Sequence, residues 1–160
     1  MEKLILYRPR LEELDYRQSL LADPETMAYN HACGGAIGFP PERWKDWYDR
    51  WLAEPNGARF YRYLRTRAGE LVGETAYHFD GEKYLCDVIV SAWYRGRGYG
   101  SQGLELLCAA ARENGVERLY DNIAADNPAA VKLFLRHGFQ IVSRTQEVVL
   151  VQKDLREGTA

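Results

Sequence analysis

Residues 85–114, LCDVIVSAWYRGRGYGSQGLELLCAAAREN, decide the fold of this 160-residue chain. The first six of them are apolar and mostly β-branched apart from Asp87, as in a central strand. From Leu104 to Ala111 apolar residues recur at helical spacing, and Gly115 provides a left-handed stop. The stretch therefore predicts a buried strand, a tight turn and a long amphipathic helix.

The turn between this strand and this helix combines glycine with arginine. Glycines adopt positive φ easily and leave backbone amides open to a ligand at a helix N-terminus, where the helix dipole favours negative charge. Two arginines add full positive charges. We therefore expect the turn to bind a phosphate or pyrophosphate. The predicted binding residues are Arg95, Gly96, Arg97, Gly98, Tyr99, Gly100 and Ser101.

Two families place glycines in this way. The pattern Gly98-x-Gly100-x-x-Gly103 matches the dinucleotide fingerprint, but a Rossmann domain carries it on its first strand, whereas antiparallel hairpins are expected before it here. The same turn also resembles the acetyl-CoA signature Q/R-x-x-G-x-G/A of the GNAT superfamily of N-acetyltransferases. Arg95, Gly98 and Gly100 fill its fixed places.

Two further segments carry the resemblance. Residues 127–139, NPAAVKLFLRHGF, resemble the family's N-x-x-A-x-x-L-Y-x-K-x-G-F, with Arg136 in place of Lys and Phe134 in place of Tyr. Residues 20–27, LLADPETM, are similar to the branch that includes the ribosomal-protein alanine acetyltransferases. The resemblance covers roughly residues 3–153, and the chain is identified as a member of the GNAT superfamily.

The remaining pattern agrees with the element order that the family implies. Strands are predicted at 3–8, 58–67, 70–79, 83–91, 118–124, 139–144 and 147–153. Helices are predicted at 11–29, punctuated by Asp23-Pro24-Glu25, from Pro41 to a break at 54–57, after the turn and after Asn127. Residues 30–40 are expected to be a loop. We expect a single α+β domain over residues 1–160, with about seven strands in a twisted mixed sheet and about four flanking helices. The resemblance implies that the sheet splays between its fourth and fifth strands.

The composition of the chain limits the classes of binding partner that we expect. The formal net charge is −2 at pH 7, which gives no electrostatic case for nucleic acid or an anionic membrane. We find neither a signal peptide nor an apolar run near the ~20 residues of a membrane span, so a cytoplasmic location is expected. The cysteines and histidines lack metal-ligand spacing, so no metal is expected and the cysteines are predicted to be free thiols. These residues are Cys33, Cys86, Cys108, His31, His78 and His137.

The resemblance implies acetyl transfer from acetyl-CoA to a primary amine by direct attack in a ternary complex. It implies that backbone around Val88, Ile89 and Val90 pairs with the pantetheine arm, and that an amide there polarises the thioester carbonyl. Asn127 would hydrogen-bond the arm from the other side of the splay, and Phe134 would line it. A small amine or a peptide N-terminus would be the acceptor.

An ammonium nucleophile must first lose a proton, so a base or a water chain is required. Family members often place a glutamate early on the fourth strand, and this chain has none there. Burying a charge in so apolar a strand costs free energy, which a functional role for the charge would explain, so Asp87 is the predicted base. The alternative is a buried carboxylate satisfied by neighbouring amides or an arginine. Glu74, on the preceding strand, is the second candidate base.

Aromatic residues form a stripe on the helix that Pro41 opens. Trp44, Trp47, Tyr48 and Trp51 recur at helical spacing. Three alternatives are open for the stripe: a wall of the substrate pocket, the surface of a homodimer, or an anchor of the helix to the sheet. The motif at 127–139 is assigned to cofactor binding. The acceptor is therefore expected to approach from the N-terminal helices and the 30–40 loop. The predicted acceptor contacts are His31, Trp44 and Trp47.

Two other functions stay open at this point. A non-catalytic acyl-CoA-binding module of the same fold would explain why the usual glutamate and tyrosine are absent. A dinucleotide-binding oxidoreductase is the weaker alternative, because it rests on the glycine spacing alone. The identity of the acceptor does not follow from the sequence.

Overall fold

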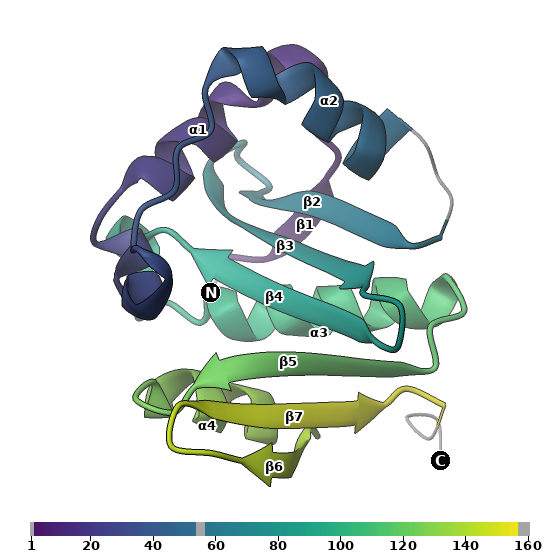
Figure 1. Cartoon of the computed structure of the whole chain (residues 1–160). Coiled ribbons are helices and arrows are strands. Elements are labelled where there is room, and N and C mark those ends of the chain that lie inside the picture. The colour runs from purple at the N-terminus through teal and green to yellow at the C-terminus, as the bar shows by residue number, and fades with distance from the viewer. Residues whose placement is uncertain (1, 54–56, 157–160) are drawn as a thin grey trace.

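The computed structural model of the protein describes residues 2–53 and 57–156. These residues form a seven-stranded sheet in the order β1-β2-β3-β4-β5-β7-β6 (Figure 1). The strands are β1 (Leu4–Tyr7), β2 (Arg59–Thr66), β3 (Leu71–Phe79), β4 (Tyr84–Val90), β5 (Arg118–Ala124), β6 (Gln140–Arg144) and β7 (Val148–Asp154). The α-helices are α1 (Asp15–Ala22), α2 (Trp44–Tyr48), α3 (Tyr99–Glu113) and α4 (Pro128–Arg136). The mixed fold that the sequence predicts is therefore confirmed.

One parallel strand pair joins two antiparallel halves of the sheet. Strands β1 to β4 form an antiparallel meander, and β5, β7 and β6 form a second antiparallel unit. Between them, β4 pairs with β5 only through Tyr84↔Leu119 and Leu85↔Tyr120, and the strands then separate. The predicted splay between the fourth and fifth strands is confirmed. A doubly wound sheet would be mostly parallel, so this topology is not that of a Rossmann domain.

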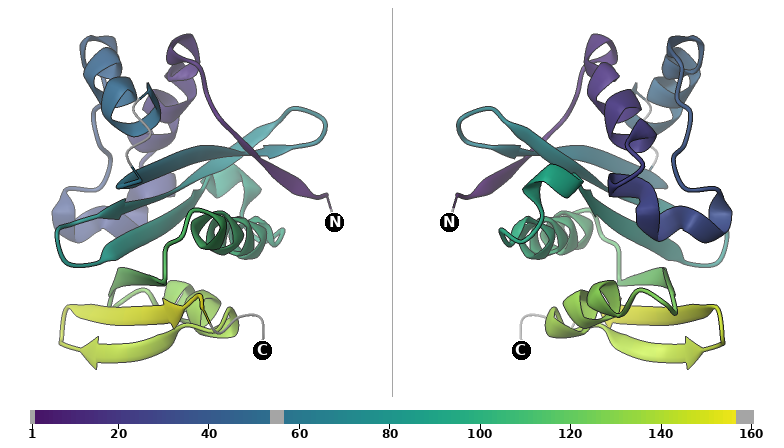
Figure 2. Two further views of the ribbon diagram at one scale, coloured as in Figure 1. Left: turned by 90° about the vertical axis from the view of Figure 1, so that its right-hand side faces the viewer. Right: turned by 90° about the vertical axis from the view of Figure 1, so that its left-hand side faces the viewer.

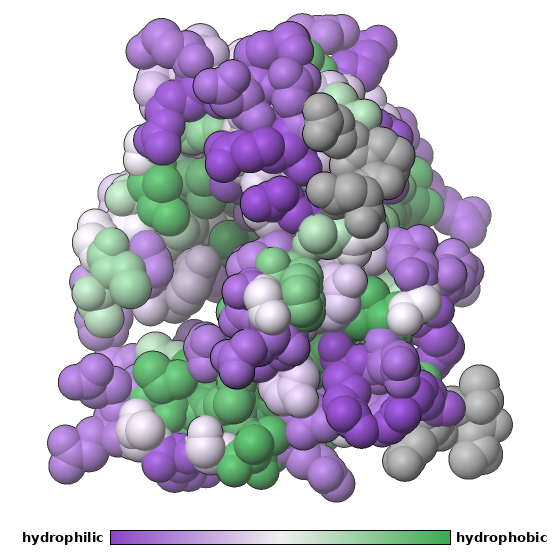
Figure 3. All heavy atoms as spheres, turned by 45° about the vertical axis from the view of Figure 1, so that its right-hand side comes forward, coloured by the Kyte–Doolittle hydropathy of each residue, from purple (hydrophilic) through white to green (hydrophobic). Residues whose placement is uncertain are grey.

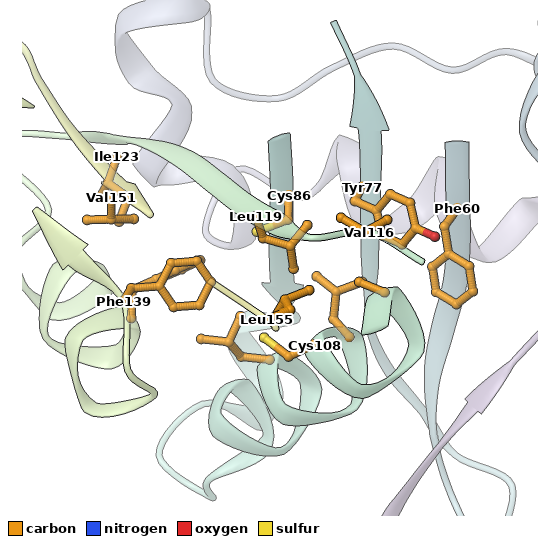
Figure 4. Close-up of a cluster of buried hydrophobic side chains, with 14 of the residues drawn as sticks. Phe60, Tyr77, Cys86, Cys108, Val116, Leu119, Ile123, Phe139, Val151 and Leu155 are labelled. Carbon is orange, nitrogen blue, oxygen red and sulfur yellow. The ribbon is translucent and has the colours of Figure 1, made fainter. Parts of the chain in front are cut away.

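Helices cover both faces of the sheet. Helices α1 and α2 lie on one face, and α3 and α4 lie on the other (Figure 2). Alternation along the strands supplies both layers: Ala76 and Ile89 pack with α1 and α2, whereas Tyr77 and Cys86 pack towards α3. Figure 4 shows the α3 side, where the free thiols of Cys86 and Cys108 are buried.

Helix α3 lies unusually close to the sheet at Gly103. A Cβ atom there would be 2.9 Å from Cδ1 of Leu64 and 3.1 Å from Cγ1 of Val88. A larger residue would have to displace the side chains of Leu64 and Val88, so glycine lets α3 pack close to the sheet without that repacking. The third glycine of the fingerprint spacing thus serves packing in this chain.

The N-terminal helical region differs in detail from the prediction. The helix expected at 11–29 is divided into η1 (Leu11–Glu13), α1 and η2 (Thr26–Cys33), with extended backbone at Asp23 before Pro24. Residues 30–33, predicted as loop, belong to η2, which ends at the left-handed Gly34. Both differences arise because Pro24 and Gly34 punctuate a segment whose composition favours helix throughout.

The helix that begins at Pro41 changes its winding along its length. It runs through η3 (Pro41–Arg43), α2 and η4 (Asp49–Ala53), which is a π-type turn. Of the break predicted at 54–57, residues 54–56 lie outside the described residues. Within the described ranges, no helix is long and apolar enough to cross a membrane.

Candidate active site

The separation of β4 from β5 opens a cleft of about 690 Å³. Strand β4 provides one wall and β5 the other, while η2 and α4 close the sides. In the space-filling view of Figure 3, a hollow enters the molecule on the left, between its upper and lower parts. The charged and polar side chains of the lining are Thr26, Tyr29, His31, Asp87, Arg95, Asp121, Asn122, Asp126 and Asn127.

The glycine-arginine turn lies at one side of this cleft. Gly96 and Gly98 both have φ +80°, and Gly98 is the N-cap of α3 without any side-chain cap. The first backbone amides of α3 therefore have no partner within the helix. Arg95 donates to the carbonyl oxygen of Thr26 at 2.9 Å, and the guanidinium of Arg97 lies 5.3 Å from the ring centroid of Tyr94. Open amides and two cations fit a phosphate group.

Ser101 is fixed by a neighbour from α4. Its hydroxyl oxygen is 2.5 Å from Nε2 of His137, and Nδ1 of His137 is 3.8 Å from a carboxylate oxygen of Glu105. None of these three side chains lines the cleft. Of the seven predicted turn residues, Arg95 and Gly100 reach the cleft wall itself.

Asp87 lies on the cleft wall, where its side chain is open to solvent. Desolvation by the surrounding protein and the charge of Glu74 raise the pKa of this carboxyl, Arg17 lowers it, and together they bring it to about 7. Water in the open cleft weakens the desolvation, and a ligand that fills the cleft would strengthen it. A carboxylate with a pKa near 7 is suited to exchange protons at neutral pH.

Glu74 lies outside the cleft lining, in the core under α1. Nη1 of Arg17 is 2.8 Å from Oε1 of Glu74, and the hydroxyl of Tyr61 donates to the same oxygen. The Arg17 guanidinium also lies 4.9 Å from the ring of Phe39 and 4.5 Å from that of Trp47. Glu74 is thus paired and enclosed, which leaves it no path to a substrate in the cleft.

The predicted acceptor residues separate into two places. His31 lines the cleft, where its Nε2 is 2.8 Å from Oδ2 of Asp126, so η2 is tied to the segment before α4. Trp47 is buried, and its ring contacts the guanidinium of Arg17. Nε1 of Trp44 donates to the carbonyl oxygen of Phe39 at 3.0 Å. Neither tryptophan lines the cleft, and their packing favours the alternative in which the stripe anchors the helix.

Sequence reasoning did not single out Asp121 of β5, which lines the cleft across from β4. Burial, followed by the negative charge of Asp87, raises the pKa of Asp121 well above its usual range. A raised pKa favours the protonated form of this carboxyl, and that form can donate a hydrogen bond. A signal was available, because Leu119, Asp121 and Ile123 alternate on one face of an otherwise apolar strand, as Asp87 does on β4.

The start of α4 completes the cleft as predicted from the second motif. Oδ1 of Asn127 accepts from the backbone amide of Ala130 at 3.3 Å and so caps α4. Phe134 is buried on the cleft wall, with its ring centroid 4.9 Å from that of Phe139. Over the part of the chain that the structure describes, no three His, Cys, Asp or Glu side chains are grouped to hold a metal ion.

Comparison with known proteins agrees with this geometry. The family model described as "Acetyltransferase (GNAT) family" matches residues 18–139, so the chain belongs to the GNAT acetyltransferase family. YobR of Bacillus subtilis, an uncharacterized N-acetyltransferase, is 31% identical over 106 residues, which are 66% of this chain and 42% of YobR. YycN of the same organism is 38% identical over 63 residues. The matched regions thus span about two fifths of these relatives.

Solved structures share the fold over nearly the whole chain. The spermidine N-acetyltransferase of Vibrio cholerae, solved with CoA and spermine, superposes with a TM-score of 0.79 and 16% identity, and covers 99% of both chains. The ribosomal-protein-alanine N-acetyltransferase of Brucella melitensis gives a TM-score of 0.74 and 22% identity, over 94% of this chain and 99% of its own. At these identities the likeness shows the fold.

We expect Asp87→Asn to change stability in a pH-dependent way. The wild-type carboxyl has a pKa of about 7 when folded and about 4 when unfolded, so folding disfavours its charged form. In the wild type, the neutral carboxyl contributes stability that is fully present below about pH 4 and is lost as the pH rises through 7. Asparagine never ionises, so the variant shows no such loss. Thermal melts from pH 4 to 8 should show the variant gaining stability over wild type as pH rises.

Asp80→Asn serves as the control of opposite sign. Backbone amides of Glu82 and Lys83 donate to Asp80, each at 2.9 Å, and lower the pKa of its carboxyl. That variant should be less stable than wild type by a constant amount above about pH 4, and the deficit should shrink in melts extended below about pH 4. A difference between Asp87→Asn and wild type that stays constant from pH 4 to 8 would contradict the raised pKa.

Proposed function

We propose that this chain transfers an acetyl group from acetyl-CoA to a primary amine by direct attack within a ternary complex. The observation that carries the proposal is the cleft between β4 and β5, which brings Arg95 and Gly100 of the glycine-arginine turn together with Asp87, a carboxyl whose pKa is raised. Family membership supports the same activity.

The cofactor's place follows from the unpaired edge of β4. Beyond Leu85 this strand has no partner in β5, so backbone groups of Val88, Ile89 and Val90 are available to the pantetheine arm. The amides and cations of residues 95–101 would hold the pyrophosphate. From the opposite wall, the Nδ2 donor of Asn127 and the ring of Phe134 would contact the arm.

The chemistry needs three proton transfers, two from the amine and one to the leaving thiolate. Ionised Asp87 accepts a proton from the substrate ammonium, directly or through one water, and the neutral amine attacks the thioester carbonyl carbon. The tetrahedral intermediate then expels the sulfur, so a C–N bond forms and the C–S bond breaks. Asp121, whose pKa is raised by burial and by the charge of Asp87, gives a proton to the departing thiolate in place of the tyrosine that Phe134 replaces. The second amine proton is released to solvent.

The charges of the cleft indicate the acceptor class. The carboxylates of Asp87 and Asp126 line it, while Arg95 lies on the side of the turn, and a cationic acceptor fits the region of the carboxylates better than an anionic one. A small amine or a peptide N-terminus meets this requirement, and spermine accompanies CoA in the Vibrio cholerae structure. His31 would contact the acceptor at the cleft, whereas Trp44 and Trp47 would act through the position of Arg17.

Gly98→Val should abolish binding of acetyl-CoA. Wild type should show a melting temperature that rises with acetyl-CoA, because the ligand binds only the folded protein. Valine is strained at φ +80° and displaces the amides of the turn, so the ligand-dependent rise should disappear. Gly81→Val is the matched control, since Gly81 has φ +106° in open space in the β3–β4 hairpin. Equal rises in both variants would remove the turn as the cofactor site.

Asp87→Asn should lower kcat/KM for the amine at pH 7 by about 10²–10⁴, the usual cost of a lost general base. The ascending limb of the pH–rate profile near pH 7 should vanish, and the defect should shrink as pH nears the amine's own pKa. Glu74→Gln should cost less and should move the limb to lower pH, because the charge of Glu74 raises the pKa of Asp87. The assignment fails if Glu74→Gln loses activity at pH 7 and Asp87→Asn does not.

Turnover across a panel of amines, followed as thiol release from acetyl-CoA, separates an enzyme from a binding module. The specific observation that favours the module is Phe134, which cannot donate a proton from the cleft wall. Stabilisation by acetyl-CoA without thiol release for any amine would establish the module instead of the enzyme.

Asp121→Leu tests the proton donor. Activity should fall by up to about 10², the lower end of acid–base effects, because thiolate is a tolerable leaving group. The descending limb of the pH–rate profile should disappear with the carboxyl, while KM for acetyl-CoA stays unchanged. Asp126→Asn, which alters an exposed carboxylate of the same cleft, should retain that limb. A descending limb that persists in Asp121→Leu would assign the proton to another group.

A further inference from the structure

A second cavity of about 540 Å³ lies at the other end of the sheet from the cleft. In Figure 1 it belongs to the right-hand side, where η4, the start of β2 and the end of α3 come together. The two cavities share no lining residue. The second is lined by Leu6, Arg8, Trp51, Leu52, Gly57, Arg59, Phe60, Arg62, Tyr77, Ala110, Glu113 and Asn114.

Three arginines of this cavity are held in place by neutral groups. Arg62 lies 4.4 Å from the ring centroid of Phe60, and its Nη1 donates to the carbonyl oxygen of Tyr61 at 2.7 Å. Arg59 lies 5.6 Å from the ring centroid of Trp51. Arg8 donates through Nη2 to the carbonyl oxygen of Leu52. Each guanidinium is oriented in this way while most of its donors stay free.

Within residues 2–53 and 57–156, none of these arginines forms an ion pair with a carboxylate. The ring-stacked Arg17 contrasts with them, because Glu74 neutralises it. Burial, and then the positive charge of Arg8, lowers the pKa of the half-buried Arg62. No carboxylate of the described residues is paired with these two like charges, and an anion placed between them would be attracted by both.

We propose that this arginine pocket binds a small dianion through phosphate or carboxylate oxygens. Planar guanidinium groups match the oxygen pairs of these anions and bind them through two parallel hydrogen bonds. Among the described residues of the lining, Arg8, Arg59 and Arg62 outnumber the single acidic side chain, Glu113, by two charges, which a dianion balances. The rings of Trp51 and Phe60 keep the cations fixed beside the bound anion.

The experiment follows thermal unfolding of the full chain in saturating CoA, which occupies the phosphate-binding turn. Inorganic phosphate and succinate are titrated separately against chloride at matched ionic strength. We expect a saturable rise in melting temperature with one or both dianions, and the stronger response identifies phosphate or carboxylate chemistry. No rise beyond that of chloride overturns the proposal.

Substitutions of single arginines test whether the dianion binds in the arginine pocket. Arg62→Gln and, at an exposed position, Arg59→Gln should each weaken the apparent Kd for the dianion about tenfold or more, because each removes a hydrogen bond to a charged group. Arg67→Gln, on the exposed turn after β2, should leave the Kd unchanged. Arg97→Gln tests the turn: a response lost in that variant and kept in Arg62→Gln and Arg59→Gln overturns the proposal, whether or not CoA binds.

Discussion

The incomplete pairing of β4 with β5 is the constraint on which the rest of this structure depends. The two strands pair through two residue pairs and then separate, so each is left with backbone donors and acceptors that no strand satisfies. Buried backbone groups require partners, and in this fold they face a water-filled cleft that can admit an extended ligand. Helix α3 links the two strands by the crossover that a parallel pair needs, and its N-terminus therefore opens beside the same cleft.

A second constraint is electrostatic. The ion pair of Arg17 with Glu74 lies under the cleft and is surrounded by the rings of Phe39, Trp47 and Tyr61. Both of its charges act on Asp87, with Glu74 raising its pKa and Arg17 lowering it. The aromatic stripe thus affects the pKa of Asp87 indirectly, because its rings hold in place the charges that raise and lower that pKa.

Local patterns predicted much of the site. The order of strands and helices, the turn at 95–101 and the position of Asn127 at the start of α4 all rest on short-range signals such as periodicity, glycine and capping. The interruption at Asp23-Pro24 was predicted from the sequence, whereas the continuation of η2 through residues 30–33 was not, because glycines and prolines marked that segment as a loop. Asp121 was not predicted, although its alternation with Leu119 and Ile123 was a signal, because the residues that surround it come from other strands.

The sequence by itself determined the elements, the splay that the family motif implies and the turn with its two cations, because each depends on residues close together in the chain. Only the tertiary structure decided what surrounds each charge. Asp87 and Glu74 are both carboxylates on adjacent strands, yet one lines the cleft and the other is paired with Arg17. Asp121 of β5 lies close enough to Asp87 of β4, across the gap between the strands, for the charge of Asp87 to raise the pKa of Asp121. Burial and charge–charge distances join residues remote in sequence, and these two quantities set pKa and access.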